Sequence, residues 1–235
     1  MKKNYIVSTL LLSGVMLFSS FTYGQNPVNT ASSKEVSSIT TGSDLEKKAT
    51  SWVESLKIND NEKNNRLKTV IMTHLEAIVD WHNSHPFSSV PSGINPVNGK
   101  PLSELDRQII ADSAIPKSVH ENLMAGLRKE LNEGQVETVL DKYTIGKVAF
   151  TMAGYHSIVP DLTPGEETVI LGYMKEAREM AVDYKGMKQI SAIFEIYKTK
   201  SEQYLNTNGR NWKTLYKAYT DILKAKKAES AKTAK

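Results

Sequence analysis

Apolar residues recur every three or four positions along most of this chain, which is the spacing that aligns side chains on one face of an α-helix. Val119, Leu123, Leu127 and Leu131 give the clearest example, at successive four-residue intervals. No segment shows the alternation of apolar and polar residues that is typical of a half-buried strand, and no internal repeat is visible. The sequence therefore predicts an all-α fold, a single domain of about seven helices.

Residues that start and stop helices divide this pattern into segments. The Thr-Pro-Gly-Glu run at residues 163–166 is a helix start, because threonine caps, proline takes the first helical position and glutamate completes the capping box. We expect a helical domain over residues 43–223, with residues 135–158 as one continuous stretch. Residues 224–235 form a lysine-rich tail that alternates Lys with Ala and Ser and has little to bury.

The first residues have the pattern of a secretory signal. Lys2 and Lys3 precede an apolar run over residues 5–18, and small side chains follow. We expect residues 1–24 to be a cleavable signal peptide and residues 25–42 to be a flexible linker. The protein would then be exported, either to the periplasm or out of the cell. Because a membrane span needs about 20 apolar residues, we expect no span in the mature protein.

Composition excludes several classes of function. The chain contains no cysteine, which rules out disulfides, thiol catalysis and thiolate metal sites. Its formal charge is +4 at pH 7, and several of the lysines fall in the leader and the tail. Nucleic-acid binding needs basic residues concentrated on a folded element, so we expect no nucleic-acid partner. No glycine-rich phosphate loop is present, and we expect no cofactor.

Residues 84–101 interrupt the helical pattern with four prolines and two glycines. The prolines remove backbone donors and the glycines permit turns. Loops longer than about 12–15 residues are uncommon in compact domains and are often functional. This segment is therefore either the first place to look for a site or a crossover between helices.

The histidines do not form a legible metal motif. His74 and His82 are eight positions apart on one predicted helix, about 12 Å along its axis and too far to share one ion. His82 and His85 could chelate together only if the helix continued that far. His120 begins no zincin motif, because Met124 stands where the second histidine would be. We expect no bound metal, and histidines that lie at the surface or are hydrogen-bonded inside.

Three acidic residues form a stripe on a later predicted helix. Glu176, Glu179 and Asp183 lie at i, i+3 and i+7. Paired carboxylates are what glycoside hydrolysis requires. The same spacing is equally typical of a solvated helix face, so both interpretations stay open.

Aromatic residues with polar edges suit sugar rings, whose axial C–H faces are apolar while their hydroxyls need partners. The same side chains are also ordinary packing material between helices. The candidates are Trp81, Tyr143, Tyr155, Tyr173, Tyr197, Tyr204, Trp212 and Tyr216.

Several short stretches, in one order, carry a resemblance to a known family. They are residues 141–146, 155–163, 176–183, 193–198 and 204–206. From about residue 51 to residue 215 the chain resembles a family of small secreted helical proteins of unknown function from polysaccharide-degrading bacteria. The resemblance implies a helical fold and sugar binding, and it brings no catalytic set. The chain departs from the family at Lys198-Thr199-Lys200, where members tend to have Lys-Gly-Arg.

Our leading hypothesis is an exported helical module that binds oligosaccharide, or assists a glycan-degradation system, without chemistry of its own. Aromatic rings would stack on sugar rings, and charged groups would hold hydroxyls or uronate carboxylates. One alternative is a glycan-active hydrolase or lyase that uses the acidic stripe. Another is an envelope chaperone or interaction protein, which would need a large exposed apolar patch. The expected ligand-binding residues are Tyr143, Arg178, Asp183, Tyr197 and Lys198.

Overall fold

The computed structural model describes residues 42–96 and 98–233, and over these residues every regular element is helical. The expected signal peptide and nearly all of the expected linker lie outside the described residues. The elements are α1 (Gly42–Glu54), α2 (Asn61–Ser84), the 3-10 turn η1 (Phe87–Ser89), α3 (Glu104–Asp112), α4 (Lys117–Glu130), α5 (Glu133–Tyr143), α6 (Lys147–Ile158), α7 (Pro164–Ala181), α8 (Met187–Thr207) and α9 (Trp212–Thr233).

The all-α prediction is confirmed, with nine α-helices in the described part of the chain where the sequence predicted about seven. One reason for the difference is residues 135–158, which we expected as a continuous stretch. They are split between α5 and α6, because Ile145 and Gly146 adopt left-handed backbone angles, with φ of 53° and 66°. The predicted start at residues 163–166 is confirmed, since Thr163 and Glu166 cap the first turn of α7 reciprocally.

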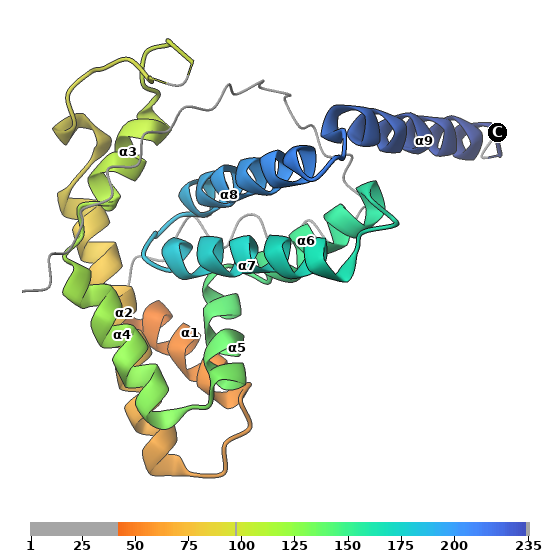
Figure 1. Ribbon diagram of the computed structural model, residues 1–235. Helices are drawn as coiled ribbons and strands as arrows, with labels where there is room; N and C mark the ends of the chain where they lie inside the picture. The colour runs from red at the N-terminus through yellow and green to blue at the C-terminus, as the bar shows by residue number, and fades with distance from the viewer. Residues whose placement is uncertain (1–41, 97, 234–235) are drawn as a thin grey trace, which may run out of the picture.

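The helices form two groups, which Figure 1 shows lying crosswise to each other. The first group is α1, α2, α4 and α5, whose apolar faces share one core that contains Leu67, Ile71 and Leu127. The second is α6, α7 and α8, whose core contains Ile170 and Met174. The helices α2 and α4 run side by side in the first group, and α7 and α8 do so in the second (Figure 1). Burial of these faces is the main stabilising contribution to the fold.

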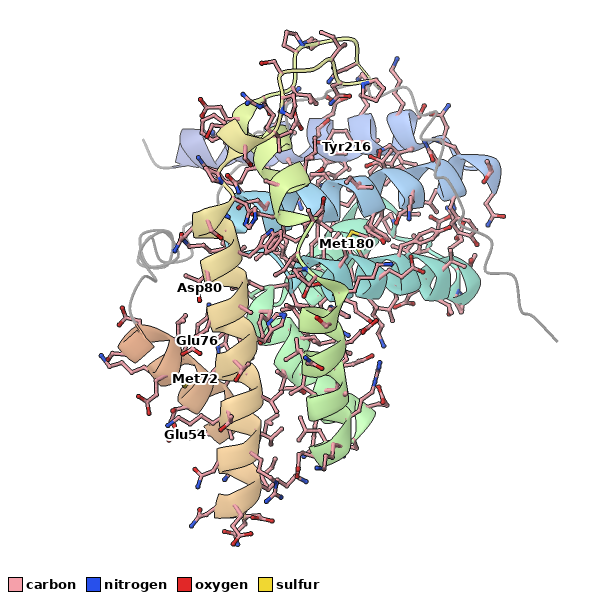
Figure 2. All side chains as sticks on the ribbon, turned by 90° about the vertical axis from the view of Figure 1, so that its left-hand side faces the viewer. Glu54, Met72, Glu76, Asp80, Met180 and Tyr216 are labelled. Atoms are coloured by element: carbon pink, nitrogen blue, oxygen red, sulfur yellow. The ribbon has the colours of Figure 1, made fainter. Side chains whose placement is uncertain are left out.

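The helix α2 illustrates how the sequence pattern positions its side chains. Met72, Glu76 and Asp80 follow at four-residue spacing along one side of the helix (Figure 2). His74 and Ile78 lie on the opposite stripe and are buried. The inward stripe of α2 thus contributes a histidine as well as apolar residues to the interior.

Residues on the N-terminal side of the 84–101 segment are held by contacts with α3. Arg107 donates from Nε to the carbonyl of Val90 over 2.9 Å, and Gln108 donates from Nε2 to the carbonyl of His85 over 3.0 Å. A single antiparallel bridge joins Ile94 and Pro101. The described residues of this segment therefore form a crossover that is attached to α3.

The helix α9 extends from the second group (Figure 1). Its beginning is held by Arg210, which pairs with Asp161 and Glu166, each over 2.8 Å. The helix continues through the expected tail to Thr233, and the side chains of residues 221–230 are exposed. Among the described helices, none is both long and apolar enough to cross a bilayer.

Candidate functional site

A cavity of about 640 Å³ lies where α1, α2 and α5 meet the turn before α8. Its volume falls within the range of ligand pockets, roughly 300–1,000 Å³. None of the described residues of the 84–101 segment lines it. The aliphatic part of the lining is Leu45, Leu75, Ile78, Val79, Ile145, Met187 and Ile190.

Three aromatic side chains also line the cavity, and we refer to Trp52, Tyr143 and Tyr184 as the aromatic wall. The rings of Trp52 and Tyr143 meet edge to face, with centroids 4.6 Å apart and an interplanar angle of 60°. Burial raises the pKa of Tyr184 to about 12, with help from the charges of Asp112 and Asp183. The Tyr184 hydroxyl therefore keeps its proton at neutral pH and can donate a hydrogen bond.

The end of α5 sets the position of this wall. Tyr143 is the last residue of the helix, and the next three residues turn the chain sharply into α6. Gly146 accepts its left-handed conformation easily, but Ile145 is β-branched and left-handed conformations are costly for such residues. Ile145 lies at the cavity and is 55% exposed. Strained backbone of this kind often occurs at functional sites, which supports the choice of this cavity.

The charged part of the lining is mostly basic. Lys48, Lys142 and Lys185 line the cavity together with one acid, Asp141. Arg178, which does not line the cavity, donates from Nη1 to Oδ1 of Asp141 over 2.7 Å. The single acid is therefore already neutralised, and the lining presents positive charge.

A chain of polar side chains leads away from the aromatic wall. The Tyr143 hydroxyl lies 3.2 Å from Nδ1 of His74, whose Nε2 lies 3.0 Å from Oδ1 of Asp183. The other oxygen of Asp183 lies 2.9 Å from Nδ1 of His120, and Nε2 of His120 lies 3.6 Å from Glu179. The contact between His120 and Asp183 is one of charge, since it lacks the alignment of a hydrogen bond. We call these five residues the polar chain.

Electrostatics within the polar chain favours a charged pair. Its contact with Asp183 raises the pKa of His120, against the effect of partial burial. Burial by itself would raise the pKa of Asp183, but His120 and His74 outweigh it and lower that pKa. Burial, followed by the charge of Asp183, raises the pKa of Tyr143 well above its ordinary value. Asp183 is therefore ionised at neutral pH, whereas Tyr143 is neutral.

The structure places three of the five expected ligand residues in this neighbourhood. Tyr143 belongs to the aromatic wall, and Asp183 is the centre of the polar chain. Arg178 is buried, and its guanidinium contacts Glu137 and Asp141 on α5, so that it reaches the cavity only through Asp141. Arg178 thus joins α7 to α5 and positions a lining residue.

The other two expected ligand residues lie elsewhere. Tyr197 is buried in the core of the second helix group. Lys198 contacts Glu195 over 2.8 Å and lines a very small pocket beside Glu202. Burial raises the pKa of Glu202 to about 7. The five residues therefore do not form one site, although they share a stretch of sequence.

The acidic stripe is divided as well. Glu179 and Asp183 both approach His120, as described above, whereas the charge of Glu176 acts on Tyr197. Glu176 and Glu179 are exposed, and the stripe does not line the cavity. Its arrangement does not place paired carboxylates across a cleft.

Two of the remaining histidines are held by hydrogen bonds or ring contacts. Nδ1 of His82 lies 3.0 Å from the buried carboxylate of Asp112, and the ring of His85 stacks on Trp81 with centroids 3.7 Å apart. Within the part of the chain that is described, no three His, Asp or Glu residues are grouped as a metal site would require.

Residue-by-residue reasoning missed Lys48, Trp52 and Lys185. Trp52 stands on the apolar stripe of its helix and reads as packing, and neither lysine belongs to a motif. His74 was visible as a polar residue on an apolar stripe, a position that indicates a hydrogen-bonded group in the interior.

Comparison with known proteins gives a family but no activity. A family model described as a protein of unknown function, DUF3826, matches residues 43–225. This range contains the cavity, the polar chain and all the stretches on which the resemblance rests. A search of curated proteins finds no match.

Proposed function

The chain belongs to the DUF3826 family of proteins of unknown function, and from the geometry of its cavity we propose that it is an exported carbohydrate-binding protein without chemistry of its own. The observation that carries this proposal is the aromatic wall inside a cavity of ligand size. Export rests on the signal-like pattern of residues 1–24.

The wall has the two properties that a sugar requires. Its rings offer flat apolar surface for the C–H face of a pyranose, and the edge-to-face contact of Trp52 with Tyr143 holds both rings in place. Tyr184, Thr138 and Asp141 also line the cavity, and their hydroxyl and carboxylate groups are the candidate partners for sugar hydroxyls. Sugar hydroxyls can thus exchange water for protein partners.

Binding is expected to be weak. Each hydrogen bond contributes only about 0.5–1.5 kcal/mol net, because the hydroxyls of a free sugar are well solvated. A dissociation constant between micromolar and millimolar corresponds to about −8 to −4 kcal/mol, which a stacked ring and a few polar contacts can supply.

The experiment uses the fluorescence of Trp52 as a reporter at the site. Titration of the protein with neutral and acidic plant oligosaccharides should change tryptophan emission in the wild type. Trp52→Phe should remove this change and weaken binding measured by calorimetry. Trp212→Phe is the matched control, because Trp212 packs in the second helix group against Tyr155.

Three outcomes separate the alternatives. Absence of heat and of emission change across the panel at millimolar ligand, with folded protein, would overturn the proposal and favour the interaction-protein alternative. Release of new reducing ends or unsaturated products would favour the glycan-active enzyme. Loss of the response in Trp212→Phe but not in Trp52→Phe would move the site to the second helix group.

A further inference from the structure

The lysines of the cavity lack acidic partners. None of Lys48, Lys142 and Lys185 forms an ion pair with a carboxylate of the described residues. The ammonium of Lys185 donates to the amide oxygen of Asn83 over 2.8 Å, which leaves its charge unbalanced. Asp141, the acid of the lining, is already paired with Arg178.

Lys48 is the most constrained of the three. Its ammonium lies 4.9 Å from the centroid of the Trp52 ring, at the aromatic wall. The side chain is half-buried, and burial lowers its pKa. A partly desolvated ammonium is unfavourable without a counter-charge, and a neighbouring ring compensates for only part of that cost. An anion bound here would provide the rest.

We infer that the sugar bound in this cavity is a uronate, and that Lys48 holds its carboxylate while the ring packs on the aromatic wall. This inference rests on the proposed carbohydrate-binding function. A lysine ammonium is a compact point charge, which suits a single carboxylate oxygen. The positive charges of Lys142 and Lys185 add to this preference for an acidic ligand. They would also attract the neighbouring acidic units of a short oligosaccharide.

The inference is tested with sugars that differ only at the carboxylate. Calorimetry would compare the methyl glycosides of galacturonate and galactose, and those of glucuronate and glucose. We expect each uronate to bind at least about tenfold more tightly than its neutral partner, a difference of about 1.4 kcal/mol. The preference should shrink as salt is added, since ions screen the attraction.

The variants identify the lysine responsible. Lys48→Met keeps the length of the side chain and removes its charge, so within this variant each uronate should bind no more tightly than its neutral partner. Lys48→Arg should retain the preference. Lys47→Met is the matched control, because Lys47 is the exposed neighbour on the same helix and does not line the cavity. Circular dichroism and melting temperature establish that each variant is folded.

The outcomes separate this inference from the function on which it rests. Equal affinity for uronates and neutral sugars would overturn the inference and leave carbohydrate binding in place. No binding of either kind would overturn the proposed function itself. A preference for glucose 6-phosphate over glucuronate would show that the lysines select phosphate. A preference that survives in Lys48→Met but is lost in Lys185→Met would show that Lys185, and not Lys48, holds the carboxylate.

Discussion

His74 and Asp183 are 109 residues apart in the sequence, yet Nε2 of one lies 3.0 Å from Oδ1 of the other. The contact joins α2, in the first helix group, to the turn that follows α7, in the second. The His74 side chain is only 1% exposed, so it could not lie there without partners for both ring nitrogens. Tyr143 is the second partner. The polar chain therefore fixes the position of an aromatic-wall residue relative to both groups.

The ion pair of His120 with Asp183 should make stability depend on pH. The pKa of His120 is raised in the folded protein. Its contribution to the free energy of unfolding is therefore complete below the ordinary pKa of 6.5 and is lost as the pH rises through the raised pKa. The pKa of Asp183 is lowered in the folded protein, so its contribution to stability is present above the ordinary pKa of 3.8 and is lost as the pH falls through the lowered pKa. The ion pair therefore stabilises the fold most between pH 3.8 and pH 6.5. Urea unfolding should show the largest difference between wild type and His120→Gln at about pH 5.5, and a smaller one at about pH 9.

His156→Gln is the control for that experiment. His156 also faces a carboxylate, that of Glu167 at 3.3 Å, but both side chains are nearly half exposed. Exposed pairs contribute about 0–1 kcal/mol, so this variant should show almost no pH-dependent difference. A difference for His120→Gln that stays constant from pH 5.5 to pH 9 would show that the ring acts by packing alone.

Arg178→Ala should lower ligand affinity and stability together. The substitution leaves Asp141 without its partner and a gap between α5 and α7. We expect a loss of about 1–3 kcal/mol in the free energy of unfolding, because a buried side chain and its charge-assisted hydrogen bond to Asp141 are both removed. Urea unfolding and sugar calorimetry of the same preparation measure both effects. A fall in affinity with unchanged stability would instead show that Arg178 contacts the ligand directly.

Tyr197→Phe and Lys198→Ala should leave sugar binding in the cavity unchanged. Both residues belong to α8 and contact the second helix group, away from the lining of the cavity. Calorimetry with galacturonate glycosides, compared with wild type, measures this directly. A tenfold loss of affinity in either variant would instead support the ligand-binding role that the sequence predicts for these residues.

The sequence predicted the helices well because periodicity and capping are local. The box at Thr163 and Glu166 needs residues only three apart, and it formed as expected. The break after Tyr143 could not be predicted in the same way. Ile145 disfavours the left-handed conformation that it adopts there, so the break runs against the local preference of its own residue.

The candidate site was predictable only in part, because it is assembled from distant segments. The sequence predicted Tyr143 and Asp183 as ligand residues, and the structure places Tyr143 at the cavity and Asp183 in the polar chain. Lys48 and Lys185 come together only through the contact of α1 and α2 with the turn before α8. No local pattern in the chain marks such a pairing, since each lysine alone is typical of a solvated helix face.

Removal of residues 224–235 should leave the melting temperature nearly unchanged. The side chains of residues 224–230 are exposed although they continue α9, so little burial is lost. Truncation after Asn211 is the comparison, since it also removes Trp212, Tyr216 and Tyr219, which pack against the second core. We expect that shorter chain to melt several degrees lower. A similar fall on truncation after Leu223 would mean that the last turns of α9 are needed.

Two helical glycines provide the sharpest test of how α2 and α4 pack. A Cβ atom on Gly126 of α4 would lie 2.7 Å from both γ-methyl groups of Val70 on α2, whereas one on Gly172 of α7 would have no neighbour within 4 Å. Gly172→Ala should therefore stabilise the protein by about 0.5–1 kcal/mol, the usual gain in a helix interior. Gly126→Ala brings the same gain but forces the helices apart, and we expect a net loss of about 1–3 kcal/mol.

The double variant Val70→Ala with Gly126→Ala identifies the cause of that loss. If overlap with Val70 is responsible, Gly126→Ala should no longer destabilise a protein that already carries Val70→Ala. The double variant should then be more stable than the sum of the two single effects predicts, by more than about 0.5 kcal/mol. Urea unfolding of the four proteins gives this coupling energy. Strict additivity, or a stabilising effect of Gly126→Ala alone, would show that α2 and α4 can separate without cost. In that case the close approach of the two helices would not be what fixes α2, and with it His74, in position.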